Sequence, residues 1–273
     1  MDGQIIAVYC LNADMLRALG HRNDGQCHLT DAEVMTIALV AALFFGGNYA
    51  LACAFLHEQH YMTRMLSPGR FNRRLHRVKD LFLTLFAFLG EHWKDLNSDS
   101  VYLIDSFPIA SCDNIRIRRS RRYRGEDYRG YIASKKRYFY GLRLHLGVTA
   151  TGEPVEMFLT PGKDSDTGAL QWYQFDLPAG STIIGDKAFN VYEIEDDLAS
   201  VGIELCPLRK KNSTRAIPPW ETYLRELSRK YIETTGSLIT QRFPKTIHAV
   251  TAAGFELKVV LFLLAYSVDC LAR

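Results

Sequence analysis

Paired cysteines and nucleotide-binding motifs are missing from this chain of 273 residues. Its six cysteines stand singly, with no Cys-x-x-Cys pair, which argues against a zinc ribbon or a disulfide scaffold and favours reduced thiols in a cytoplasmic protein. Neither a P-loop nor a Gly-x-Gly-x-x-Gly motif occurs, so we expect no nucleotide cofactor. Internal repeats and low-complexity segments are also missing, and no charged region precedes an apolar stretch, so we expect no signal peptide.

Long hydrophobic runs are few. The uncharged run from Val34 to Leu56 is long enough to cross a bilayer, but Gly46-Gly47-Asn48 divides it into two shorter pieces. We therefore predict two buried helices joined by a turn, and no membrane partner. The composition, 48% hydrophobic and 12% aromatic, is sufficient for an ordinary core, and a net charge of +3 does not by itself indicate a polyanionic partner.

Helical signals dominate residues 1–97. Thr30-Asp31-Ala32-Glu33 has the pattern of a capping box, and Ser67-Pro68 has the pattern of a further helix start. After the polar stretch at 97–100 we expect strands at 101–109, 138–149, 154–160, 181–186 and 203–206, with helices near 166–174 and 192–200 and around Glu233.

Three consecutive strands followed by alternating helices and strands favour a mixed sheet with helices on its faces. The predicted class is α/β: a ribonuclease-H-like mixed β-sheet flanked by helices, preceded by an all-helical N-terminal domain. We predict a helical domain at 1–97 and a second domain at 98–273, which holds the sheet and a basic insertion at 111–137.

Two short apolar runs, Val101–Asp105 and Ser181–Asp186, each end in an aspartate. A third carboxylate, Glu233, lies in a helical pattern, where Glu221 and Glu226 compete with it on spacing alone. Each acid singly is also typical of a turn, a helix cap or a solvated surface. Together, in this order, the three predict a cage for hard divalent cations, because Mg²⁺ prefers carboxylate oxygens and paired ions serve phosphoryl transfer on nucleic acid.

Basic residues gather in several segments. Between Asn114 and Arg137, ten basic residues face only two acids, and tyrosines interleave, which favours phosphate neutralisation and stacking on unpaired bases; a solvated charged loop is the alternative. The helix at 68–79 either belongs to a helix-turn-helix or faces solvent. Its arginines predict that the domain at 1–97 binds DNA ends or dimerises, and the three acids make 98–273 the predicted catalytic domain. The DNA-binding candidates are Arg70, Arg73, Arg74, Arg77, Arg116, Arg118, Arg119, Arg121, Arg122, Lys135, Lys136, Arg209, Lys210, Lys211, Arg229 and Lys230, and the tyrosines are Tyr123, Tyr128 and Tyr131.

Two further positions stay open. Arg229 and Lys230 lie on the same helix face as Glu233 and either form plain helix ion pairs or bring positive charge to DNA. His248 follows Pro244-Lys245 and is interpreted as a surface residue, with a phosphate contact as the alternative.

Several segments resemble the DDE transposases of bacterial insertion sequences. The resemblance covers most of the chain, and its motifs are specific together although each is weak alone. The segments are Phe45–Tyr49, Arg70–Leu75, Ile104–Pro108, Cys112 with Arg116-Ile117, Tyr138–Leu142, Gly185–Lys187, Pro207–Ser213, Arg229–Thr234 and Gly254–Lys258.

The resemblance implies a ribonuclease-H-like core that uses two Mg²⁺ or Mn²⁺ ions, with Asp105, Asp186 and Glu233 as the catalytic and metal-binding triad. It implies binding to double-stranded DNA at terminal inverted repeats and at the target, strand cleavage by water, and attack of the freed 3′-hydroxyl on target DNA. It also implies a homodimer on DNA, in the bacterial cytoplasm and associated with the nucleoid.

One departure from the family pattern is Gly236, where similar sequences carry a bulky residue. A mid-helix glycine costs about 1 kcal/mol relative to alanine and is expected to shorten the helix just past Glu233. A catalytically decayed or domesticated transposase that acts as a non-enzymatic DNA-binding protein is therefore the alternative. A hydrolytic nuclease on the same fold is a third interpretation.

Overall fold

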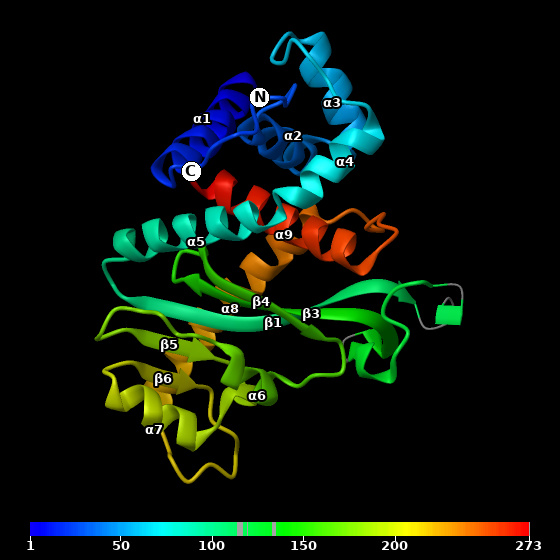
Figure 1. Ribbon diagram of the computed structural model, residues 1–273. Helices are drawn as coiled ribbons and strands as arrows, with labels where there is room; N and C mark the ends of the chain where they lie inside the picture. Colours follow the sequence, from blue (N-terminus) through cyan, green and yellow to red (C-terminus); the bar gives the residue numbers. More distant parts are fainter. Residues whose placement is uncertain (114–116, 119, 133–134, 273) are drawn as a thin grey trace. The chain divides into compact units, whose positions relative to one another are not determined.

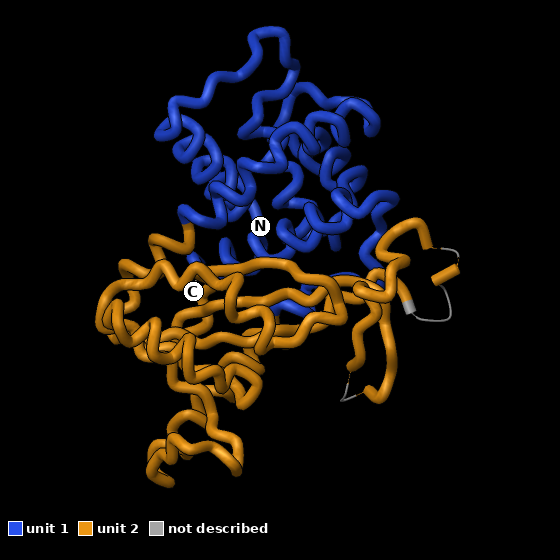
Figure 2. Tube along the Cα trace, turned by 60° about the horizontal axis from the view of Figure 1, so that its bottom comes forward, with its two compact units in different colours: residues 1–88, 239–273 blue, residues 89–238 orange. Residues whose placement is uncertain are grey.

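The computed structural model describes residues 1–113, 117–118, 120–132 and 135–272 (Figure 1). The chain forms two compact units: residues 1–88 with 239–273, called here the helical unit, and residues 89–238, called the sheet unit (Figure 2). This division differs from the predicted one in two respects. The first boundary lies after residue 88 rather than after residue 97, and the C-terminal helix packs with the N-terminal helices, where its apolar side chains find their partners.

The helical unit is built around two helices that are apolar on nearly every side. α2 is buried almost continuously from Ala32 to Ala42, and α9 from Val259 to Tyr266, and the two pack against each other. The predicted capping box at the start of α2 is confirmed, with both of its hydrogen bonds present. The elements are α1 (Asp2–Ala18), α2 (Asp31–Phe44), α3 (Tyr49–Glu58), α4 (Pro68–Arg77), the first part of α5 (Lys79–Leu96) and α9 (Ala252–Cys270).

The break between α2 and α3 is made by two glycines. Gly46 and Gly47 have φ of 55° and 77°, a left-handed conformation that side chains other than glycine rarely adopt. The two predicted helices joined by a turn are therefore confirmed. No single helix among the described residues is long and apolar enough to cross a membrane; α2 and α3 pass that test only as a pair, and the pair is bent by 109°.

The sheet unit contains a mixed sheet in the strand order β2-β3-β1-β5-β6, with β4 also paired to β3. β1, β3 and β4 are antiparallel, whereas β5 and β6 run parallel to β1. The predicted α/β class, a mixed sheet flanked by helices and preceded by a helical region, is confirmed. The elements are β1 (Val101–Asp113), β2 (Arg129–Ile132), β3 (Arg137–Thr149), β4 (Pro154–Pro161), α6 (Asp166–Ala169), β5 (Thr182–Gly185), α7 (Tyr192–Ser200), β6 (Glu204–Pro207) and α8 (Pro219–Arg242), which continues into the helical unit.

An apolar core lies beneath the parallel strands. Ile104, Ile183 and Leu205, one from each of the three parallel strands, pack with Phe189 and with Leu198 of α7. In Figure 1, α7 lies beside β6, which it contacts. This packing fixes the end of the parallel ladder between β1 and β5, just before the two predicted aspartates.

Two local predictions needed correction. β1 continues to Asp113, beyond the expected end at 109, because the antiparallel ladder with β3 extends that far. Helix α8 runs unbroken to Arg242, so Gly236 does not shorten it. A further strand, β2, forms within the stretch predicted as a basic insertion.

Candidate active site

Asp105 and Asp186 follow equivalent positions of two neighbouring parallel strands. β1 pairs with β5 up to Leu103 and Ile184, and each aspartate lies two residues beyond its paired position. Because parallel strands present their carboxyl ends at one edge, the two side chains are neighbours, and the charge of Asp186 acts on Asp105. The parallel ladder, rather than β1 itself, ends at this point.

The carboxyl group of Asp105 is strongly perturbed. Burial raises its pKa to about 6, and the negative charges of Asp166 and Asp186 act in the same direction. The backbone N–H of Ser106, which donates to Asp105 Oδ1 at 2.7 Å, and the charge of Arg229 act against the rise. An ionised carboxylate in this setting is costly, and a nearby cation would stabilise it.

Arg229 connects the other two acids. Its Nη1 lies 3.4 Å from Asp186 Oδ1, and its Nη2 lies 3.1 Å from Glu233 Oε1, one helical turn further along α8. The helix ion pair predicted between Arg229 and Glu233 is therefore present. One guanidinium thus links the helix acid to the strand-end acid, and its charge also reaches Asp105.

The three predicted carboxylates are donors of the type that a divalent cation prefers. In the part of the chain that the structure describes, no three His, Cys, Asp or Glu side chains lie close enough together to hold one ion. Their chemistry nevertheless fits, since all three donors are carboxylates and the Arg229 guanidinium already places positive charge between Asp186 and Glu233. The metal-binding role of the triad stays a prediction.

A fourth acid, Asp166, lies beside this site and was missed by the sequence analysis. Its carboxylate accepts a hydrogen bond from Ser106 Oγ, and Arg143 Nη1 donates to Ser106 Oγ at 2.9 Å and to Asp166 Oδ1 at 3.3 Å. We call these residues the Arg143–Ser106–Asp166 cluster. It fixes the residue directly after Asp105 from two other elements, β3 and α6.

A sequence signal for this cluster exists in hindsight. Arg143 is the only Lys, Arg, Asp or Glu in the stretch Tyr138–Val148, which forms most of the buried strand β3. A charged side chain in such a strand needs a partner. The sequence does not say that the partner is Asp166, which lies on a separate element.

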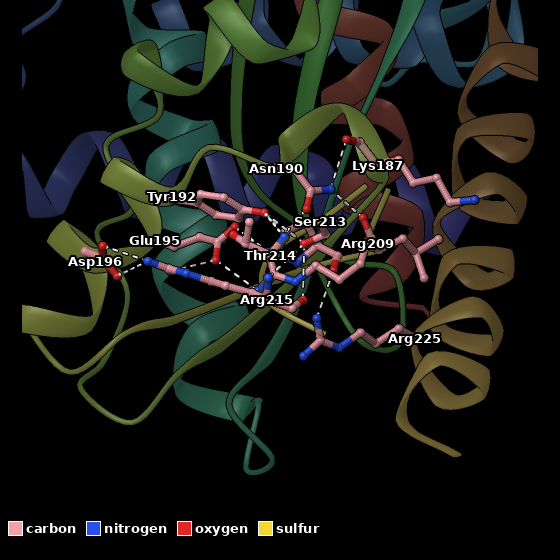
Figure 3. A network of polar contacts seen from close by, with 12 residues as sticks. Lys187, Asn190, Tyr192, Glu195, Asp196, Arg209, Ser213, Thr214, Arg215 and Arg225 are labelled. Carbon is pink, nitrogen blue, oxygen red and sulfur yellow. Dashed lines mark hydrogen bonds and ion pairs between the residues drawn. The ribbon is translucent and has the colours of Figure 1, made fainter. Parts of the chain in front are cut away.

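The turn after Asp186 is held by a network of polar contacts (Figure 3). Asn190 Nδ2 donates to the carbonyl oxygens of Lys187, at 3.0 Å, and of Leu208, while Arg209 Nη1 donates to Asn190 Oδ1 at 3.2 Å. Asp186 itself accepts from the backbone N–H of Lys187 at 2.6 Å. These contacts join the Asp186 turn to the segment that follows β6.

Arg209, a predicted DNA contact, is mostly buried within that network. Its guanidinium donates to both carboxylate oxygens of Glu195, at 2.6 and 2.9 Å, and Arg215 donates to the same carboxylate at 3.1 Å. Glu195 is only 5% exposed, so its buried charge depends on these two arginines for compensation. The neighbouring Lys210 and Lys211 are exposed and keep the prediction of DNA contact.

Helix α8 is fixed to the sheet at two points. The buried Arg225 pairs with Glu221 and donates from Nη1 to the carbonyl oxygen of Pro207 at 2.8 Å (Figure 3). Further along, a Cβ atom on Gly236 would lie 3.1 Å from Cε1 of the Phe107 ring, which is tighter than an ordinary contact. Gly236 thus allows α8 to approach β1 closely, and Glu233 lies between these two anchor points.

The arginines of α4 divide into two groups. Arg70, Arg73 and Arg77 are exposed on the helix surface. Arg74 is largely buried, pairs with Asp31 and donates to a backbone carbonyl at the start of α2. Its immediate role is therefore structural, and the three exposed arginines keep the prediction of DNA contact.

The predicted basic insertion is described in part. Arg116 and Arg119 lie outside the described residues. Tyr131 and Tyr138 are exposed and pair across β2 and β3 with ring centroids 4.9 Å apart, whereas Tyr123 is buried against Tyr128. Four of the predicted DNA-binding residues in this insertion are exposed, namely Arg118, Arg121, Lys135 and Lys136, and Arg122 is partly buried. Lys230, on α8, is also exposed.

Known proteins that resemble this chain are transposases. No curated protein matches the chain. A cryo-EM structure of a piggyBac transposase synaptic complex with hairpin DNA aligns with 10% sequence identity and a TM-score of 0.42, over 95% of this chain and 70% of that one. Residues 96–243, more than half of the chain, match the family described as the transposase DDE domain. The chain therefore belongs to the DDE transposase family.

Proposed function

We propose that this transposase cuts DNA at the terminal inverted repeats of a bacterial insertion sequence and joins the freed 3′-hydroxyl to target DNA. The observation that carries the proposal is the environment of Arg229, which contacts Asp186 and Glu233 and whose charge also acts on Asp105. Asp105 and Glu233 are 128 residues apart in the sequence, and the packing of α8 against the strands places both within reach of one guanidinium charge.

The three carboxylates would hold Mg²⁺ or Mn²⁺, with Asp105 as the central ligand. When bound, two such ions activate the attacking oxygen and stabilise the leaving one. Asp105 suits the central position because burial disfavours its ionised form in the absence of a compensating cation. Arg229 holds Asp186 and Glu233 through one ion pair to each, and the Arg143–Ser106–Asp166 cluster limits movement of the β1 backbone next to Asp105.

DNA would be held by the exposed basic residues of both units. In the sheet unit these are the side chains of the basic segment together with Lys210, Lys211 and Lys230; in the helical unit they are the exposed arginines of α4. Such residues neutralise phosphates and release counterions. Since a transposase holds two ends at once, a homodimer on DNA is part of the proposal.

The decisive test compares Asp105→Asn with wild type in a cleavage and joining assay on terminal-repeat DNA with Mg²⁺ or Mn²⁺. Asp99→Asn is the matched control, because Asp99 is exposed just before β1 and outside the site. We expect Asp105→Asn to abolish cleavage while DNA binding is largely retained, and Asp99→Asn to behave as wild type. Normal cutting by Asp105→Asn in Mg²⁺ would overturn the assignment.

The same assay separates the other candidate functions. A non-enzymatic DNA-binding protein would bind the repeats without cutting them in either metal. The argument for a catalytically decayed protein relied on a shortened helix, and α8 continues unbroken through Gly236. A hydrolytic nuclease would cut but would not join pre-cut ends to a target.

A further inference from the structure

Two adjoining cavities open in the helical unit, with volumes of about 630 and 380 Å³. They share Tyr49, His248 and Lys258 in their linings. Three of the segments that resemble insertion-sequence transposases, Phe45–Tyr49, Arg70–Leu75 and Gly254–Lys258, contribute to their walls. None of these segments belongs to the candidate active site, so their convergence needs a separate explanation.

Every ionisable side chain around these cavities, apart from the phenol of Tyr49, is a base. Lys258, His76 and His248 line them, and neither lining includes an aspartate or a glutamate among the described residues. A concave surface with this composition attracts anions. The larger volume falls within the range of roughly 300–1,000 Å³ found for ligand sites, so a phosphate with its flanking sugars fits.

Lys258 is the central cation of this surface. It is half-buried in α9, where its ammonium donates to the carbonyl oxygen of Gly47 at 3.2 Å and lies 5.0 Å from the centre of the Tyr49 ring. Burial lowers the pKa of Lys258. An ammonium has three donors, and the Gly47 carbonyl accepts from one of them, so an incoming anion would accept from the others and compensate the half-buried charge.

Helix α4 separates this cavity from its exposed arginines. Asn72 and His76 line the larger cavity from one side of the helix. Arg70, Arg73 and Arg77 lie on the other side, where they line a separate cavity. The bases that face the two adjoining cavities are therefore Lys258 and the two histidines, and Lys258 is the strongest of them.

We propose that these cavities form a binding site for a phosphate of the DNA backbone, with Lys258 as its main contact and Asn72 and His76 at its rim. The choice of DNA as the polyanion rests on the proposed function. Binding is measured without divalent metal, however, so the result is independent of whether the carboxylate site cuts DNA.

The test measures the affinity of the full chain for a fluorescent DNA duplex at several salt concentrations, in EDTA. Each phosphate contact contributes about one to the slope of log K against log salt. Lys258→Met should lower that slope by about one and weaken binding at about 0.1 M salt by roughly tenfold. Arg17→Met is the matched control: it removes one positive charge from an exposed position in the same unit and should leave the slope unchanged.

A second variant guards against misfolding of the first. Asn72 is exposed, so Asn72→Asp should fold normally and should weaken DNA binding by placing a negative charge at the rim. Thermal unfolding of each variant, with and without inorganic phosphate, accompanies the titrations. An unchanged slope in folded Lys258→Met, or equal losses in Lys258→Met and Arg17→Met, would overturn the proposal. A site for free phosphate alone, with phosphate-dependent stabilisation but normal DNA binding, would overturn it as well.

Discussion

Replacing Asp105 with asparagine should stabilise the folded sheet unit in the absence of metal, although it removes the central carboxylate of the candidate site. The reason is electrostatic. Burial raises the pKa of this carboxyl group from 3.8 to about 6, so the folded protein at neutral pH holds an ionised group that it disfavours. Asparagine has nearly the same shape and can still accept the hydrogen bond from the Ser106 N–H through its Oδ1 atom.

The magnitude follows from the pKa. A rise from 3.8 to about 6 corresponds to about 3 kcal/mol, since each pKa unit is worth about 1.4 kcal/mol. Because Asp105 is only partly shielded from solvent, screening reduces this value, and we expect about 1–3 kcal/mol in favour of Asp105→Asn. For a protein of this size that is a rise of roughly 2–10 °C in the midpoint of thermal unfolding.

The dependence on pH has a definite sign. A carboxyl group with a raised pKa in the folded state contributes most to stability below its unfolded value, near pH 4, and that contribution is lost as the pH rises through about 6. The two proteins should therefore be equally stable near pH 4. The advantage of Asp105→Asn should grow between about pH 4 and 6 and stay constant above about pH 7.

The assay is thermal or urea unfolding of wild type and Asp105→Asn across this pH range in EDTA, repeated with Mg²⁺. Mg²⁺ should stabilise wild type and have little effect on Asp105→Asn, because a ligand that binds only the folded state stabilises it. A variant that is less stable than wild type at neutral pH in EDTA would refute the electrostatic reasoning. Equal stabilisation of both proteins by Mg²⁺ would refute the role of Asp105 as a ligand.

Two further predictions concern the supports of the site. Asp166→Asn should lower the cleavage rate by about tenfold or more without changing DNA affinity, because a misplaced catalytic group slows the reaction. Asp164→Asn, two residues away, is the control. An equal loss of DNA binding and of cleavage in Asp166→Asn would contradict this prediction. Gly236→Leu should destabilise the protein by about 1–3 kcal/mol and reduce cleavage, because its side chain would collide with Phe107. Unchanged unfolding and cleavage in Gly236→Leu would show that the close approach of α8 to β1 is not required.

The sequence was sufficient for features that depend on local pattern. The capping box at Thr30 and Glu33, the glycine break after Phe45 and the helix at 192–200 each depend on residues within one turn or one helix, and all are present in the structure. The order of strands and helices was predicted for the same reason, because the hydrophobic period of each segment is a local property.

Predictions about Gly236 and the length of β1 were wrong for a common reason. Helix propensity penalises Gly236, but the close contact with Phe107 requires a residue without a side chain there. Likewise, pairing with β3 extends β1 past the end of its apolar run. In both cases an interaction with a distant element outweighed the local preference.

The roles of the basic residues show where sequence reasoning stops. Arg74 and Arg209 look like their exposed neighbours in the sequence, yet each is paired with an acid more than a dozen residues away, Asp31 and Glu195. Asp166 could be linked to the candidate site only once β3 and α6 were placed beside β1.

By itself, then, the sequence determined the fold class and the order of the elements, because these follow from short-range pattern. It also predicts the three acids of the candidate site, from motifs that resemble those of a family. The tertiary structure alone decided which charges are satisfied internally, that Arg229 joins Asp186 to Glu233, and that three separate segments surround Lys258. These are contacts between residues far apart in the chain, and their energies exist only when packing brings the side chains within a few ångströms and excludes water between them.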